Sequence, residues 1–182
     1  MLSRDDVLRG LKQLAERLDA DGINVAIHLV GGAAVMLTVR PDRQLTTDVD
    51  SWVNSRGDEL LRTRVIEAVM LVGRANPGFP DDWLNDNASM FIPDNVSGDL
   101  SGWDRLLTVG GVTIVVAPPE VLLAMKLLAG RGRRDIPDLP PLIAACGVTT
   151  VREVEGIFDR YYPHDDMKPS ARRWLTEFSG LS

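Results

Sequence analysis

The sequence predicts an α/β fold, with a small mixed sheet and its helices followed by a helical C-terminal portion. Residues 23–30 form a short apolar run that ends in two glycines, as expected of a buried strand. Residues 105–109 and 112–117 are rich in strand-forming side chains and flank a second glycine pair, which is a strong β-hairpin signal. The part of the chain after Pro118 is expected to be all helical. We expect a core over residues 1–117 and a helical portion over residues 118–182 packed on it, with one continuous domain as the alternative.

Local signals define the other elements. Ser3 is a candidate N-cap, with Asp5 and Asp6 in the first turn of an amphipathic helix. Thr150 and Glu153 form a capping-box pattern at the start of a later helix. The other expected elements are a buried helix over residues 32–39, a strand over 45–53, helices over 59–72, 121–129, 141–145, 151–161 and 169–178, a helical or irregular segment over 80–87, a strand over 90–93 and a basic loop over 131–134.

The composition is that of a globular protein and narrows the possible partners. The chain has 182 residues, of which 45% are hydrophobic, and its formal net charge is −6. This charge argues against a broad nucleic-acid-binding surface, although Mg²⁺ and local arginines can reverse the field at one site. The single cysteine, Cys146, excludes an internal disulfide and a cysteine-based zinc site. No apolar run is long enough to span a bilayer, so we expect a cytoplasmic protein with no membrane partner.

The segment from Gly31 to Asp50 carries the strongest indication of chemistry. The pair Gly31-Gly32 follows the first predicted core strand and opens a helix, so its backbone N–H groups can face a phosphate. Asp48 and Asp50 are two residues apart on the next expected strand, and side chains at this spacing project from one face. Carboxylate oxygens arranged in this way can bind Mg²⁺. A phosphate site beside a magnesium site is the minimal requirement for nucleotidyl transfer.

Each half of this pattern has a simpler explanation when it is taken alone. Paired glycines most often serve turns or close packing, and alternating aspartates are common on exposed strand faces. The order of strand, Gly-Gly, helix, loop and Asp-x-Asp strengthens both halves. Two adjacent carboxylates also repel each other unless a cation or hydrogen-bond donors lie between them. We therefore interpret Asp48 and Asp50 as metal ligands.

A second group of ionisable residues lies in the helical portion. Lys126 is the one charged residue in the apolar segment 121–129, which should be buried. Its ammonium group either reaches the surface along the helix or is retained for a purpose such as triphosphate binding. In the next segment, Asp135 and Asp138 would share a face if that segment were helical. The arginines there, including Arg134, indicate either phosphate contacts or a solvated loop with internal ion pairs.

Two other residues are better explained by packing than by chemistry. Trp83 is more readily a tryptophan at the edge of the core than a base-stacking platform. His28 lies within the first core strand and is interpreted as a packed strand residue. The sequence has no Walker loop, dinucleotide-binding fingerprint or Gly-x-Ser-x-Gly motif.

Five segments together resemble one protein family. They are Leu29-Val30-Gly31-Gly32-Ala33-Ala34, Thr47-Asp48-Val49-Asp50, Trp83-Leu84-Asn85-Asp86, Leu123-Ala124-Met125-Lys126-Leu127 and Arg134-Asp135-Ile136-Pro137-Asp138-Leu139. The family is the minimal nucleotidyltransferase-like proteins of bacterial toxin–antitoxin and abortive-infection systems, of the AbiEii and MenT type. The glycine pair followed by Asp-x-Asp is moderately specific, and its conjunction with the later Lys…Arg-Asp-x-x-Asp-Leu segment is more so.

The resemblance implies a fold, an activity and a set of site residues. The fold would be a polymerase-beta-like nucleotidyltransferase core with C-terminal helices. The activity would be transfer of a nucleoside monophosphate from an NTP to RNA, including tRNA 3′ ends, or to a protein hydroxyl, in a toxin that an antitoxin protein neutralises. The implied residues are Gly31, Gly32, Thr47, Lys126 and Arg134 for nucleotide binding, Asp48 and Asp50 for Mg²⁺ or Mn²⁺, and Asp48, Asp50, Lys126, Asp135 and Asp138 for catalysis.

The chain also departs from the wider superfamily in two places. Gly32 stands where serine is common, and the expected strand over residues 112–117 carries no third carboxylate, although Asp99 and Asp104 are near it in sequence. The alternative reading is a non-catalytic nucleotide- or RNA-binding module on the same fold. A third reading is an interaction domain whose aspartates are surface residues.

Overall fold

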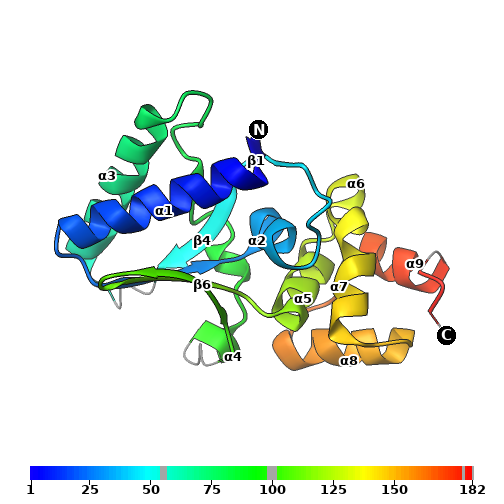
Figure 1. Ribbon diagram of the computed structural model, residues 1–182. Coiled ribbons are helices and arrows are strands. Elements are labelled where there is room, and N and C mark those ends of the chain that lie inside the picture. Colours follow the sequence, from blue (N-terminus) through cyan, green and yellow to red (C-terminus); the bar gives the residue numbers. More distant parts are fainter. Residues whose placement is uncertain (54–56, 98–101, 178, 182) are drawn as a thin grey trace. The chain divides into compact units, whose positions relative to one another are not determined.

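The computed structural model describes residues 1–53, 57–97, 102–177 and 179–181, and confirms the predicted α/β fold (Figure 1). By their contacts these residues divide into two compact units, one of Met1–Ser89 with Trp103–Ala117 and one of Met90–Gly102 with Pro118–Ser182. The strands are β1 (Leu2–Ser3), β2 (Val25–Leu29), β3 (Leu45–Thr46), β4 (Val49–Val53), β5 (Leu84–Asn85), β6 (Asp104–Val109) and β7 (Val112–Val116). The helices are α1 (Arg4–Ala20), α2 (Gly31–Thr38), α3 (Glu59–Ala75), α4 (Asp94–Ser97), α5 (Pro119–Ala129), α6 (Gly132–Asp135), α7 (Leu139–Cys146), α8 (Val151–Tyr161) and α9 (Pro169–Glu177).

The first unit is built on a mixed five-stranded sheet with the strand order β5-β4-β2-β7-β6. In β2, Leu29 pairs antiparallel with Ser51 of β4 and parallel with Val116 of β7, so β2 lies inside the sheet. The strands β6 and β7 form the predicted hairpin. Helices α1 and α3 pack against each other and lie on one side of the sheet (Figure 1).

Helix α1 shows how a local sequence signal leads to packing. The Ser3 hydroxyl accepts the Asp6 N–H at 3.1 Å, and the Asp6 carboxylate accepts the Ser3 N–H at 2.9 Å, so the predicted cap is a full capping box. A cap of this kind stabilises a helix by about 1 kcal/mol. The apolar residues at helical spacing then bury one face of α1: Val7, Leu11, Leu14, Ala15 and Leu18.

The expected strand over residues 45–53 is broken into two. Leu45 and Thr46 form β3, which pairs with β1 in a separate two-stranded sheet, whereas β4 starts at Val49 and joins the main sheet. The Thr46 hydroxyl donates to the Asp48 carbonyl at 3.0 Å across the break. Because the chain passes from one sheet to the other here, the side-chain alternation of a continuous strand does not determine the direction of the Asp48 side chain. The prediction that Asp48 and Asp50 lie on one strand is therefore wrong, although β4 does contain Asp50.

Other short elements were predicted incorrectly or not at all. Residues 89–91 form a 3₁₀ turn instead of a strand over 90–93, the segment 80–87 contains β5, and the expected loop over 131–134 falls largely in α6. Neither β1 nor α4 was expected. Elements of two to four residues have little periodicity of their own and are stabilised by what they pair with, so a pattern search does not find them.

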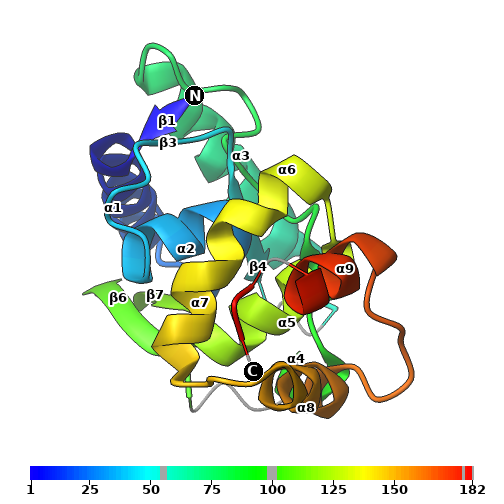
Figure 2. The same ribbon diagram turned by 90° about the vertical axis from the view of Figure 1, so that its right-hand side faces the viewer.

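In the second unit, α5 contacts α7, α8 and α9 (Figure 2). All residues of α5 from Val121 to Leu127 are buried, which agrees with its uniformly apolar sequence. The segment that precedes β6 joins this unit through two hydrogen bonds to carbonyl groups: Asn95 donates to Arg160 at 2.9 Å, and the Tyr162 hydroxyl donates to Phe91. Among the described residues, no helix combines the length and apolar character needed to cross a membrane.

Candidate functional site

The turn between β2 and α2 depends on Gly31. Its φ of 69° lies in the left-handed region, which glycine adopts readily because it has no Cβ. Val30, the N-cap of α2, is extended and offers no side-chain cap to the first N–H groups of the helix. Its own N–H donates to the Asp50 carbonyl at 3.0 Å, which ties the turn to β4. The structure thus contains the predicted glycine turn at a helix N-terminus.

The Asp50 side chain lies directly against this turn. A Cβ added to Gly31 would be 2.1 Å from Oδ2 of Asp50, far inside van der Waals contact. The half-buried carboxylate therefore occupies space that any other side chain at position 31 would fill. Two features therefore require glycine at position 31: the left-handed backbone and the close approach of the Asp50 carboxylate.

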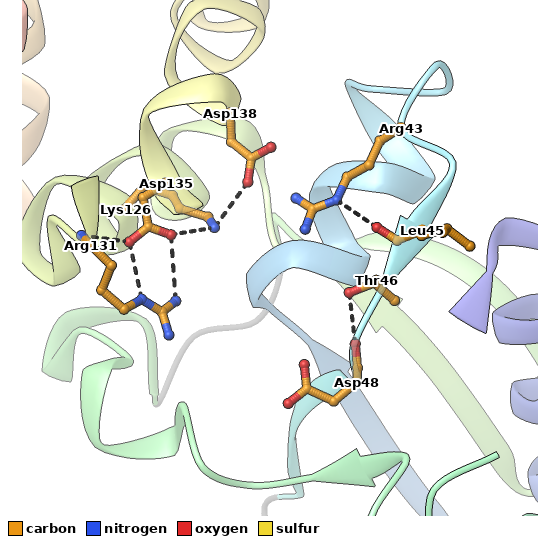
Figure 3. Close-up of polar contacts among 8 residues, drawn as sticks. All are labelled: Arg43, Leu45, Thr46, Asp48, Lys126, Arg131, Asp135 and Asp138. Carbon is orange, nitrogen blue, oxygen red and sulfur yellow. Dashed lines mark hydrogen bonds and ion pairs between the residues drawn. The ribbon is translucent and has the colours of Figure 1, made fainter. Parts of the chain in front are cut away.

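Asp48 reaches the same part of the first unit by a different route. It lies in the break between β3 and β4, and its backbone is held through the Thr46 hydroxyl (Figure 3). Its side chain is half-buried, and Val49 next to it is fully buried, as expected. Thr47 is exposed, and its hydroxyl donates to the Met1 sulfur at 3.7 Å. The nucleotide contact assigned to Thr47 thus stays a prediction.

Arg43 was not predicted to lie at this site. A Cβ added to Gly32 would be 2.9 Å from Nη2 of Arg43, so the guanidinium group lies over the second glycine of the turn. The Arg43 Nε donates to the Leu45 carbonyl at 3.3 Å (Figure 3). The only sequence feature that could have indicated a role for Arg43 is its position shortly before the Asp-x-Asp motif. That position does not predict contact with Gly32. Only the path of the loop between α2 and β3 shows this contact.

The donor set around the turn fits Mg²⁺. Asp48 and Asp50 supply hard carboxylate oxygens, and Mg²⁺ commonly takes one or two carboxylates together with waters and substrate phosphates. Over residues 1–53, 57–97, 102–177 and 179–181, no cluster of three or more histidine, cysteine or acidic side chains is suited to a metal ion.

In the second unit, Lys126 is buried in an acidic environment. Its Nζ lies 2.8 Å from Oδ1 of Asp135 and 3.0 Å from Oδ2 of Asp138, and all three side chains are at most 6% exposed (Figure 3). The ammonium group does not reach the surface, so the alternative in which Lys126 extends along the helix to solvent is wrong. Asp135 ends α6 and Asp138 ends the following 3₁₀ turn, which puts both carboxylates on the side of Lys126.

Arg131 completes this cluster. Its backbone N–H and its Nε donate to Oδ2 of Asp135 at 2.8 and 3.1 Å. Two carboxylates and two cationic side chains are thus combined, so the cluster is formally neutral. Arg134, one turn of chain later on α6, is exposed. Its assigned role in nucleotide binding stays a prediction.

Two opposing effects determine the pKa of Asp135. Burial by itself raises the pKa of this carboxyl, but the charge and hydrogen bonds of Lys126, together with those of Arg131, outweigh burial and lower it below its ordinary value. The carboxylate is therefore ionised in the folded protein at neutral pH. Asp135 thus takes part in the cluster as an ion-paired carboxylate.

This shift predicts a pH dependence of stability. Because the pKa of Asp135 is lower in the folded than in the unfolded state, the unfolded chain binds more protons in acid, and the stabilisation is lost as the pH falls through the folded pKa. We expect the free energies of unfolding of the wild type and Asp135→Asn to differ by a constant amount above about pH 5 and to converge below about pH 4. Urea unfolding at stepped pH measures this difference. An equal difference at about pH 3 and pH 7 would contradict the ion-paired assignment.

The predictions for Trp83 and His28 are confirmed. Trp83 is fully buried, and its indole N–H donates to the Val69 carbonyl at 3.0 Å. His28 is buried with its ring centroid 5.0 Å from that of Trp52 and 5.1 Å from that of Trp103, and burial lowers its pKa. Neither side chain is available to a substrate.

The comparisons with known proteins bear on the fold. No protein-family model and no curated protein matches the chain. The chain is similar to the crystal structure of an antigenic nucleotidyltransferase-like protein from Paracoccidioides brasiliensis, with a TM-score of 0.53 and 19% sequence identity. The similarity covers 96% of this chain and 94% of that one. Likeness at this identity establishes a shared nucleotidyltransferase-like fold, which the sequence analysis expected.

Proposed function

We propose that this protein is a nucleotidyltransferase that uses Mg²⁺ or Mn²⁺ and an NTP. The observation that supports this most strongly is the contact of the Asp50 carboxylate with Gly31 at the start of α2. It combines an anionic group suited to a metal with backbone N–H groups suited to a phosphate.

In the first unit, different residues would bind the metal and the phosphates. Asp48 and Asp50 would hold the metal, which when bound would draw charge away from the phosphates during in-line attack at the α-phosphate. The N–H groups at the start of α2 would bind phosphate oxygens, since their N-cap residue offers them no side chain. Arg43, over Gly32, would add positive charge beside those oxygens.

In the second unit, the sequence resemblance implies triphosphate contact by Lys126 and Arg134, of which Lys126 is buried with its ammonium group held by Asp135 and Asp138, whereas Arg134 is exposed. The acids Asp135 and Asp138 would orient the Lys126 ammonium group, because both lie within ion-pair distance of it. A buried lysine held by two carboxylates has a fixed direction, unlike an exposed lysine with free rotamers. The resemblance to the later motif of the AbiEii and MenT type supports a catalytic role for one of these acids.

We further propose RNA, including tRNA, or a protein hydroxyl as the acceptor, and a bacterial, cytoplasmic toxin neutralised by an antitoxin as the biological setting. These finer assignments rest on the sequence resemblance. The test incubates the protein with each α-labelled NTP, Mg²⁺, total RNA and cell lysate, followed by gel separation. We expect label on one macromolecular band with one or more NTPs, and its loss when EDTA replaces Mg²⁺.

A non-catalytic nucleotide- or RNA-binding module is the second candidate, and one observation favours it. The strand β7, from Val112 to Val116, carries no acid, and Asp104 at the start of β6 is exposed. Asp99 lies outside the described residues. Calorimetry that detects NTP binding, combined with no labelled product from any acceptor, would select this candidate over the enzyme.

A further inference from the structure

A cavity in the first unit plays no part in the proposed reaction. It measures about 560 Å³ and lies between α3 and the strands β4 and β5. Val65, Val69 and Leu84 are buried apolar residues of its lining, and Trp52 also borders it. Its volume falls within the range of about 300–1,000 Å³ that is typical of ligand sites. None of the residues assigned to nucleotide or metal binding lines it.

The cavity is bordered by the edge of β4 that β5 pairs with only in part, as far as the described residues show. Since the Val30 N–H bonds to the Asp50 carbonyl, alternation directs the backbone groups of Asp50 and Trp52 toward β2, and those of Val49 and Val53 toward the opposite side. There β5 pairs with β4 only at Val49 and Asp50, as far as the described residues show. By this alternation the N–H and C=O groups of Val53, which borders the cavity, face the same side as β5, where an extended segment would pair with them by strand addition.

Helix α3 adds an exposed apolar face to this edge. Ile66 and Met70 are one helical turn apart, both border the cavity, and their exposed fractions are 50% and 36%. Exposed apolar side chains beside a strand edge match the alternating side chains of an added strand. The edge supplies backbone hydrogen bonds, and α3 supplies the apolar contacts.

The rim of the cavity is acidic. Asp81, Asp82 and Asp86 border it together with one base, Arg62. The Arg62 Nη2 already binds the Asp86 carboxylate at 2.6 Å, whereas Asp81 and Asp82 are exposed and form no ion pair within the described part of the chain. Two uncompensated carboxylates favour a cationic ligand and disfavour nucleic acid. They also disfavour a second copy of this chain, whose net charge is −6.

We propose that this cavity binds an extended segment of a partner protein, with apolar residues at alternate positions and lysine or arginine between or beside them. The segment pairs with the edge of β4 beyond β5, buries its apolar side chains against Ile66 and Met70, and places its basic residues near Asp81 and Asp82. The proposal is independent of nucleotidyl transfer. Its test therefore does not depend on whether the protein is an enzyme.

The test selects binders from a phage-displayed library of random peptides of about ten residues on the full-length protein. We expect enriched sequences with alternate β-branched or aromatic residues and basic residues. Binding of the synthetic peptide, measured by fluorescence anisotropy, should weaken about tenfold or more in Ile66→Glu. The matched control is Leu60→Glu, because Leu60 is 69% exposed on the same helix but does not border the cavity.

Charge reversal provides the second arm. The variant Asp81→Lys/Asp82→Lys should lose affinity for the basic peptide and gain it for a version in which glutamate replaces each basic residue. A peptide with N-methylated backbone nitrogens at alternate positions should bind poorly. The proposal is overturned if no peptide is enriched, if enriched peptides are acidic or show helical spacing, if Ile66→Glu and Leu60→Glu bind alike, or if a single-stranded RNA probe binds the cavity in place of the peptide. It is also overturned if the wild type is a dimer that Ile66→Glu dissociates.

Discussion

Replacing Lys126 by methionine is expected to lower the free energy of unfolding by about 3–5 kcal/mol. The substitution keeps most of the apolar stem but removes the ammonium group that binds Asp135 and Asp138. Asp135 retains Arg131, whereas Asp138, which is 1% exposed, loses a direct ion pair in a desolvated position. The loss reflects mainly the removal of two short ion pairs in a desolvated position, and urea unfolding at neutral pH measures it.

A partner variant separates this cause from a general loss of packing. Adding Asp138→Leu to Lys126→Met also removes the buried charge that faces position 126, so the double variant should recover part of the lost stability. The matched surface change Lys12→Met, at a lysine whose side chain is 69% exposed, should alter stability by less than about 0.5 kcal/mol. If Lys126→Met is as mild as Lys12→Met, the buried ion-pair cluster does not exist in solution.

Alanine at Asp48 or at Asp50 is expected to reduce nucleotide transfer by about 10³-fold or more. Either substitution removes one of the two carboxylates to which metal binding is assigned, and with it the charge that the site offers to a divalent cation. The half-buried positions of both side chains predict little effect on the fold. Labelling with the productive NTP measures the rate, and circular dichroism with urea unfolding verifies that each variant is folded.

Asp42→Ala is the control for this experiment. Asp42 lies in the same loop region as Arg43, but it is exposed and its carboxylate pairs with Arg40. It should leave transfer unchanged. Labelling by Asp48→Ala and Asp50→Ala at the wild-type rate would rule out the assigned metal ligands, and therefore the proposed mechanism.

Elements with strong local signals were predictable from the sequence. The capping boxes of α1 and α8 have both hydrogen bonds of the motif, and the glycine pair between β6 and β7 forms the expected hairpin. The apolar segment before Gly31 is a strand of the main sheet, and Lys126 lies on a buried helix. Each of these signals is carried by neighbouring residues, so the pattern contains the structural information.

The sequence by itself therefore determined the α/β class, the glycine turn at the start of α2 and the residue types that a metal and a phosphate require. Tertiary structure alone decided how those residues are used. The break between β3 and β4 depends on pairing with β1, Arg43 meets Gly32 through the course of a loop, and Lys126 is retained inside by two carboxylates from a later segment. These contacts join residues far apart in the chain, and their stability comes from pairing and desolvation, which no local periodicity encodes.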